Sequence, residues 1–151
     1  MITLIAVGKK HESWVQAGIE RYEKRLRAPF DVKWVLLPHS SKEDDSARQE
    51  ESERILKRLG SDAYVVLLDE RGKQFSSPQV SAQIETVAAS GRPLTAIIGG
   101  AFGVDASIHQ RADLVLSFSP MVFPHQLVRL MLVEQLYRWQ SIATGGKYHH
   151  E

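Results

Sequence analysis

The stretch Leu116-Ser-Phe-Ser-Pro-Met-Val-Phe-Pro-His-Gln-Leu-Val-Arg129 connects an apolar strand to a long apolar helix through a polar, proline-interrupted turn. Pro124 suits the first helical position, where the missing N–H is not needed. His125 and Gln126 then lie beside unpaired backbone N–H groups at the positive end of the helix dipole. Arg129 follows His125 by four residues, so both side chains project from one helical face. The turn therefore predicts a site at the end of a strand, if other strand ends lie beside it.

Outside this stretch, strand and helix patterns alternate along the whole chain. Short, β-branched and nearly continuous apolar runs indicate buried strands at residues 2–7, 31–37, 63–68, 94–98 and 113–118. Helical spacing of apolar residues indicates helices from 13 to before 29, at 46–59, from 77 to about 91, from about 105, and at 124–139. This alternation predicts an α/β fold whose parallel sheet is covered on both faces. We expect one domain over residues 1–151, because no linker or repeat interrupts the pattern.

The composition excludes several classes of protein. A chain of 151 residues can bury a real hydrophobic core. None of its apolar runs approaches the roughly 18 residues that a membrane span requires. The first residues place apolar side chains ahead of positive ones, which reverses the order of a secretion signal. Without cysteine there are no disulfides, thiolate metal sites or cysteine nucleophiles. We therefore expect a cytoplasmic protein with no membrane partner.

The charge is nearly balanced but unevenly distributed. A net charge of +1 produces no global attraction for nucleic acid. Residues 21–27 are locally basic, whereas residues 43–53 are rich in acidic side chains. The basic run is either a solvated helix face or a local patch for RNA phosphates, and the sequence leaves both open.

Three strand ends carry distinctive residues, at positions 68–72, 99–103 and 117–124. In open α/β sheets, ligands bind beyond the carboxyl ends of the strands, so these segments are expected to converge on one ligand. The glycine loop at 99–103 either lets backbone approach that ligand or only makes a tight turn. It matches neither a P-loop nor the dinucleotide fingerprint, and the histidines show no metal-ligand spacing on one element. Backbone amides and apolar side chains suit an adenosine-containing cofactor; the apolar side chains are those of Leu68, Leu116, Phe118 and Met121.

Several separated motifs resemble one known family, and they cover nearly the whole chain. They are Ile5-Ala-Val-Gly-Lys9, Tyr22-Glu-Lys-Arg-Leu26, Leu68 with Gly72-Lys73, Ile97-Ile-Gly-Gly100, Leu116-Ser-Phe-Ser119, Phe123-Pro-His-Gln-Leu-Val-Arg129, Glu134-Gln-Leu-Tyr-Arg138 and Tyr148-His149. In order and spacing they resemble the RlmH family of SPOUT methyltransferases. That family methylates N3 of a pseudouridine in the RNA of the large ribosomal subunit.

The resemblance implies a fold, a cofactor and partners. It implies a C-terminal trefoil knot, a homodimer, ribosomal RNA or the ribosome as substrate, no metal, and S-adenosylmethionine as cofactor. The implied cofactor residues are Leu68, Gly99, Leu116, Ser117, Phe118, Ser119, Pro120 and Met121. Composition agrees with a dimer, because residues 124–139 hold too many apolar side chains for one buried stripe. The alternative is a helix that lies wholly inside one monomer.

The implied reaction needs the N3 proton to leave before or during methyl transfer, with the help of a base or of cations that stabilise the anion. The candidates are His125, Arg129, Tyr148 and His149. We expect His149 to deprotonate or position the pyrimidine, unless the tail is simply exposed to solvent. Arg129 is expected to contact RNA phosphate or a uracil carbonyl; the alternative is an ion pair, perhaps with Glu134. His125 either takes part in the chemistry or braces the start of the helix.

One residue departs from the family pattern. His150 follows the Tyr-His pair where the family has Arg or Lys, and a mostly neutral histidine would hold a phosphate more weakly at neutral pH. Two other classes of protein stay open on sequence alone. One is a non-enzymatic ribosome-associated module that retains a cofactor pocket. The other is a flavodoxin-like or nucleotide-handling α/β protein, which the same alternation of strands and helices permits.

Overall fold

The computed structural model describes residues 1–150 and contains a five-stranded sheet in the order β2-β1-β4-β3-β5. All neighbouring strands are parallel. The strands are β1 (Ile2–Val7), β2 (Val32–Leu37), β3 (Tyr64–Lys73), β4 (Leu94–Ile98) and β5 (Leu114–Leu116). The predicted parallel α/β sheet is therefore confirmed.

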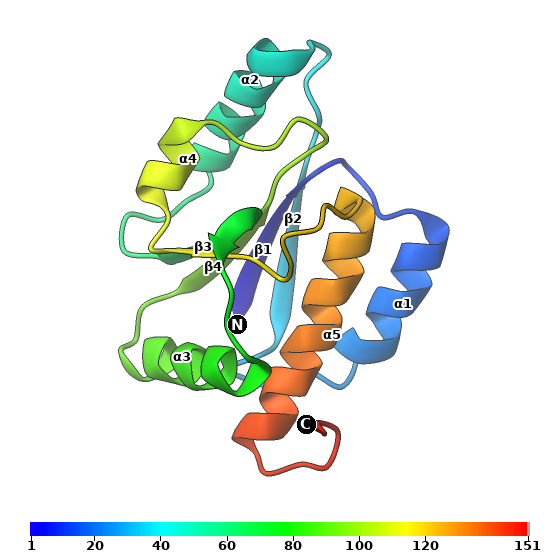
Figure 1. Cartoon of the computed structure of the whole chain (residues 1–151), viewed down its shortest axis with the longest axis vertical. Coiled ribbons are helices and arrows are strands. Elements are labelled where there is room, and N and C mark those ends of the chain that lie inside the picture. The colour runs from blue at the N-terminus through cyan, green and yellow to red at the C-terminus, as the bar shows by residue number, and fades with distance from the viewer. Residues whose placement is uncertain (151) are drawn as a thin grey trace.

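Helices cover both faces of this sheet (Figure 1). They are α1 (Ser13–Glu23), α2 (Asp44–Leu56), α3 (Ser77–Ala89), α4 (Ala106–Arg111) and α5 (His125–Ala143). Strand β1 shows why its sequence is continuously apolar. Leu4 and Ala6 join the core shared with α1, α3 and α5, whereas Ile5 and Val7 join the core shared with α2 and α4. Side chains that alternate across the sheet thus meet apolar partners on either side.

Strand β3 is longer than the sequence indicates. It was expected to end at Leu68, but it continues to Lys73 and forms an arch, because Leu68 and Lys73 both pair with Leu116 of β5. The arch needs glycine at position 72, where a Cβ atom would lie 2.5 Å from the carbonyl oxygen of Val115. Ser117 then fastens the chain to the arch: its N–H donates to the Lys73 carbonyl (2.8 Å) and its hydroxyl to that of Glu70 (3.1 Å).

Helix α5 begins one residue later than expected. Pro124 has φ −55° and ψ 138°, so it is the N-cap residue rather than the first helical residue, and its carbonyl accepts from the N–H of Val128 (3.1 Å). The helix runs beyond Trp139 to Ala143. Gly145, with φ +72°, then reverses the chain, which suits a residue that lacks Cβ. Among residues 1–150, no helix has the length and apolar character needed to cross a membrane.

Candidate functional site

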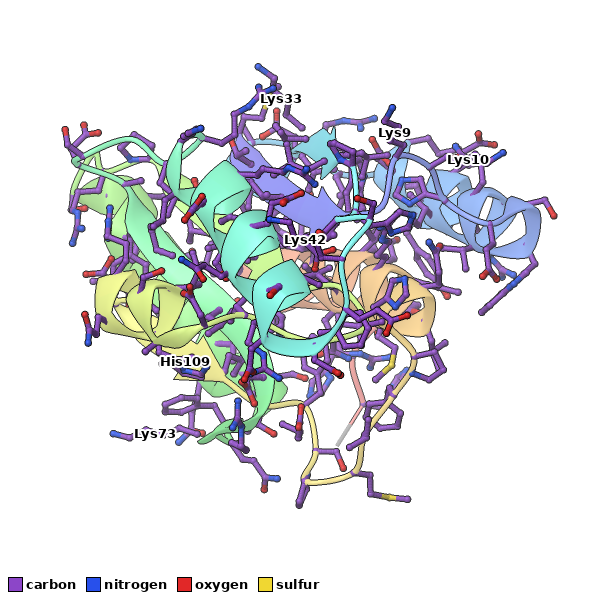
Figure 2. All side chains as sticks on the ribbon, turned by 90° about the horizontal axis from the view of Figure 1, so that it is seen from above. Lys9, Lys10, Lys33, Lys42, Lys73 and His109 are labelled. Atoms are coloured by element: carbon purple, nitrogen blue, oxygen red, sulfur yellow. The ribbon has the colours of Figure 1, made fainter. Side chains whose placement is uncertain are left out.

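The three strand ends singled out in the sequence meet at one edge of the sheet, the side seen in Figure 2. Leu68 pairs with Ile98, the residue before Gly99, and also with Leu116. A cavity of about 60 Å³ lies at this junction. Five of the predicted cofactor residues line this cavity. Its full lining, called the strand-end wall below, is Leu68, Asp69, Glu70, Leu116, Phe118, Ser119, Met121, Phe123 and Val128.

The other predicted cofactor residues shape this wall rather than line the cavity. Ser117 is buried, and its hydroxyl also contacts the carbonyl of Ser119 (2.9 Å). The Ser119 hydroxyl in turn accepts from the N–H of Met121 (3.1 Å), which closes a tight turn around the exposed Pro120. Gly99 packs against Gly103, whose backbone would lie about 3.2 Å from an added Cβ. Glycine is thus required there for close packing inside the loop.

The chemistry of the wall fits an adenosine-containing group, but the cavity is small. About 60 Å³ is well below the roughly 300 Å³ at the lower end for small-molecule pockets. Met121 and Val122 are 70% and 78% exposed, so the turn that covers the cavity has few packing contacts to hold it closed. The side chains present thus suit a cofactor of this class in chemistry, whereas the volume of the cavity is smaller than such a group.

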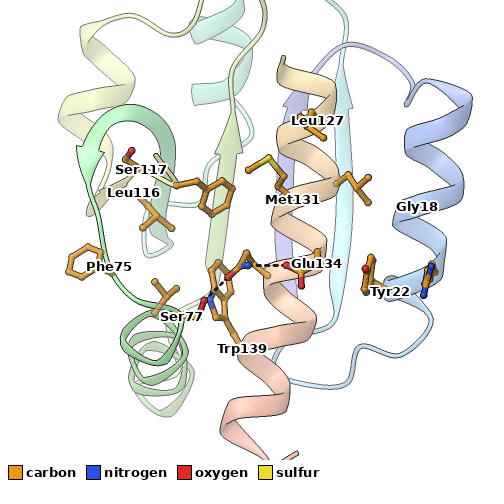
Figure 3. Close-up of a pocket in the computed structure, with 15 residues that line it drawn as sticks. Gly18, Tyr22, Phe75, Ser77, Leu116, Ser117, Leu127, Met131, Glu134 and Trp139 are labelled. Carbon is orange, nitrogen blue, oxygen red and sulfur yellow. Dashed lines mark hydrogen bonds between the residues drawn. The ribbon is translucent and has the colours of Figure 1, made fainter. Parts of the chain in front are cut away.

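A larger groove of about 640 Å³ lies on the other side of the same wall (Figure 3). It runs along α5 between α1 and α3, from Leu127 to Trp139, and Leu116 and Phe118 line it too. Apolar side chains of α5 face this groove and are only half-buried, namely Leu127, Leu130 and Met131. The apolar surplus in the sequence of this helix is therefore only partly buried within one chain.

Arg129 does not lie where the sequence suggested. Its side chain is 0% exposed, so in this structure it cannot touch an RNA phosphate. Its guanidinium donates to the carbonyls of Val7 (2.7 Å), Gly8 (3.2 Å) and Lys10 (3.2 Å). The alternative ion pair with Glu134 is also wrong, because Glu134 pairs with Arg138 (2.6 Å). Arg129 instead braces the loop that follows β1.

Replacing Arg129 by methionine is expected to lower the free energy of unfolding by about 2–4 kcal/mol. The reason is that several buried carbonyls would lose a charged donor, which leaves them unsatisfied. Guanidinium denaturation measures the change, with Arg58→Met at the exposed turn between α2 and β3 as control. Equal unfolding midpoints for the two variants would show that the buried guanidinium is not stabilising.

His125 is half-buried at the first position of α5. Burial lowers its pKa, and the nearby Arg129 and His39 lower it further. Burial also lowers the pKa of His11, followed by the effect of Arg129. Since the ordinary histidine value is about 6.5, both rings are mostly neutral at neutral pH. Within residues 1–150, His125 forms no side-chain cap hydrogen bond at the start of α5, so its two sequence interpretations, chemistry or bracing of the helix, both stay open.

The C-terminal tail returns to the other end of α5. The Tyr148 hydroxyl donates to Glu134 (3.0 Å), and Arg138 lies over the Tyr148 ring. Arg138 Nη1 lies 3.3 Å from Nδ1 of His149. Because arginine can only donate, Nδ1 is the acceptor of that contact. The tail is therefore attached to the helix, and its Tyr and His stand beside an acid and a cation.

The phenol of Tyr148 is a hydrogen-bond donor rather than a base. Burial raises its pKa well above the ordinary tyrosine value, and hydrogen bonding with Tyr22 and Glu134 raises it further.

Glu134 and Arg138 were not assigned a role from the sequence. Their spacing of four residues on a helix, acid before base, was the signal that predicts such a pair. Its connection to the tail depends on tertiary structure.

The tail lies against the second half of α5, where Tyr148 contacts Glu134 and His149 contacts Arg138, whereas most of the strand-end wall precedes the first residue of the helix (Figure 1). The helix has 19 residues and is therefore about 28 Å long. His149 is not among the residues that line the cavity beside Leu116. Within residues 1–150, no group of three or more His, Asp or Glu side chains is arranged to hold a metal ion.

A family model described as "Predicted SPOUT methyltransferase" matches residues 1–149. The chain therefore belongs to the SPOUT methyltransferase family, and the flavodoxin-like alternative is wrong. Among curated relatives, Ribosomal RNA large subunit methyltransferase H of Pelotomaculum thermopropionicum is 41% identical over 157 residues, which cover 99% of this chain and 98% of the relative. Proteins of the same name from Acetivibrio thermocellus and Thioalkalivibrio sulfidiphilus are each 41% identical, covering 98% and 99% of both chains, respectively. These relatives confirm the resemblance found in the motifs.

Proposed function

We propose that this protein transfers a methyl group from S-adenosylmethionine to N3 of a pseudouridine in the RNA of the large ribosomal subunit. The observation that carries the proposal is the similarity, over almost the full length of both chains, to relatives named ribosomal RNA large subunit methyltransferases. The convergence of three strand ends on one wall supports it. Methyl transfer would take place in the cytoplasm, which contains the ribosomes.

The wall around Leu68, Leu116 and Phe118 would hold the cofactor, with Ser117 and Gly99 fixing the backbone around it. When bound, S-adenosylmethionine supplies an electrophilic methyl group on a sulfonium. A wall of apolar side chains and backbone excludes water and contributes by positioning, which is a large part of such an acceleration. The exposed turn at Met121 and Val122 is the entrance that the small cavity requires.

The C-terminal tail would supply the polar groups that contact the target pyrimidine. N3 of pseudouridine lies between two carbonyls and must lose its proton to become a nucleophile. His149 and Arg138 are held together, so they place an imidazole beside a permanent cation. Such a pair would stabilise the pyrimidine anion at its carbonyl oxygens as the N3 proton passes to solvent water, whereas Tyr148 keeps its proton and anchors the tail to Glu134.

A homodimer unites the two halves of this site. A twofold axis across α5 would pair two copies of the helix in opposite directions and cover the groove lined by Leu127 and Met131. The tail of one copy would then face the strand-end wall of the other. The separation of tail and wall within one chain is the feature that this arrangement explains.

We also infer that the chain is knotted. The support is the arch of β3 from Leu68 to Lys73, because the segment that leaves β5 is hydrogen-bonded to that arch through Ser117. Passage of α5 and everything after it through such an arch would make a trefoil. Threaded chains are rare, so alternation of strands and helices alone would not predict one.

The experiment that tests the proposal is a methyl-transfer assay on bacterial ribosomes whose pseudouridine is unmethylated. Labelled methyl should appear in large-subunit RNA, and hydrolysed RNA should yield N3-methylated pseudouridine. Calorimetry with S-adenosylmethionine separates the alternatives. Binding without transfer would indicate a non-enzymatic module, and absence of binding would contradict the cofactor assignment.

A further inference from the structure

The loop Gly8–Glu12, between β1 and α1, is held by an unusual number of inward contacts from α5. Gln126 accepts from the N–H of Glu12 (3.0 Å) and donates to the carbonyl of Lys10 (3.3 Å). The buried Arg129 donates to three carbonyls at the end of β1 and in this loop. Both side chains thus fix the backbone of the loop without contributing to its outer surface.

Glycine at position 8 is part of this fixation. Gly8 has φ +118°, and an added Cβ would lie 2.9 Å from Nη2 of Arg129. Its N–H donates to the carbonyl of Leu37 (2.6 Å), which ties the loop to β2 as well. With carbonyls directed inward, the loop is rigid and its outer surface consists of side chains.

The side chains directed outward are lysines. Lys9 and Lys10 are exposed and extend away from the ribbon at the end of the sheet seen in Figure 2. Neither forms an ion pair within residues 1–150, whereas Lys42 on a neighbouring loop pairs with Glu50 (2.9 Å). The adjacent acid, Glu12, accepts a hydrogen bond from the indole N–H of Trp14 (2.6 Å). The two ammonium groups are therefore available to an external anion.

This surface lies at the same end of the sheet as the candidate methyl-transfer site. Gln126 and Arg129 begin the helix that follows the wall segment at residues 116–121, so one helix start supports both features. A fixed backbone lowers the ordering cost of binding, and lysine ammonium groups suit the phosphates of a polyanion. The arrangement is that of a preorganised phosphate contact at the same end of the sheet as the candidate cofactor wall.

We propose that the loop Gly8–Glu12 is a contact surface for the RNA backbone, in which Lys9 and Lys10 bind phosphates of the ribosomal RNA that flank the target nucleotide. The inference rests on the proposed function, since it names where that substrate is held. It assigns the buried Arg129 an indirect role, as a positioning residue for the loop.

The test compares two double variants that remove the same charge from opposite ends of the sheet. Lys9→Ala with Lys10→Ala removes the proposed contact. Lys57→Ala with Arg58→Ala, between α2 and β3, removes two exposed cations at the amino ends of the strands. Binding to purified large ribosomal subunits is measured by co-sedimentation at several salt concentrations, so the result is read even without catalysis.

The loop variant is expected to bind about tenfold more weakly at 0.1 M salt, and its slope of log K against log salt should fall by about 1 to 2. The control variant should match the wild type, and both should bind S-adenosylmethionine normally. Equal binding by the two variants, in an enzyme that still methylates, would overturn this inference alone. A wild type that binds subunits but transfers no methyl would overturn the proposed function alone, and one that binds no subunits would overturn both.

Discussion

Replacing His149 by alanine is expected to lower the rate of methyl transfer by about 100-fold or more, the usual magnitude for loss of a group that stabilises developing negative charge. The imidazole is held beside Arg138 and near Glu134, so the tail is an ordered part of the molecule rather than a solvent-exposed extension. Removing it takes away the imidazole that lies beside the Arg138 guanidinium in the proposed contact with the pyrimidine. Tyr148 remains attached to Glu134, so the tail itself should keep its place.

The affinity for S-adenosylmethionine should change by less than about threefold, because apolar side chains and backbone make up the cofactor wall. Calorimetry measures that affinity, and single-turnover assays on ribosomes measure the rate. His150→Ala is the matched control, since it removes the neighbouring, exposed imidazole. If His149→Ala turned over at the wild-type rate, the tail histidine would have no part in the chemistry.

Replacing Met131 by glutamate is expected to convert a dimer into a monomer and to abolish methyl transfer. Met131 faces the groove along α5 and is only half-buried within one chain, so a carboxylate there is tolerated by the monomer. Covered by a second copy, the same carboxylate would be buried without a partner, at a cost of several kcal/mol. In the proposed shared site, loss of the dimer would also separate the tail of one copy from the wall of the other.

Sedimentation velocity over a range of concentrations measures the mass of each variant. Ala89→Glu, at the exposed end of α3, is the control for an added surface charge and should stay dimeric. Circular dichroism checks that Met131→Glu remains folded. A folded Met131→Glu variant that keeps the mass and activity of the wild type would place the subunit contact elsewhere.

The sheet was predictable because each strand has a recognisable pattern of apolar residues in its own sequence. Each is an apolar run whose neighbours are helical, and the end of β4 just before Gly99 follows from that pattern, whereas β5 ends at Leu116, two residues earlier than expected. The arch of β3 was not predictable. Residues 69–73 are polar and have no strand pattern, and they are extended only because Lys73 pairs with Leu116 and Gly72 lacks the Cβ that would meet Val115.

The role of Arg129 was missed for a related reason. Arginine is rarely buried fully, so a helical arginine close to a histidine is expected to face solvent or substrate. Its burial depends on carbonyls more than 100 residues earlier, which no local pattern connects to it. The tail is similar: Gly145 reverses the chain, and only tertiary structure brings Tyr148 back to Glu134.

The claim that one site is built from two subunits is tested most directly by mixing two inactive variants. Ser119→Trp fills the cavity at the strand ends, and His149→Ala removes the tail imidazole. Random reassociation makes half of the dimers mixed, and each of these would hold one site with an intact wall and an intact tail. Methyl transfer to ribosomes should then recover to about one quarter of the wild-type rate. A mixture that stays inactive, although native mass spectrometry shows the mixed dimer, would contradict a shared site.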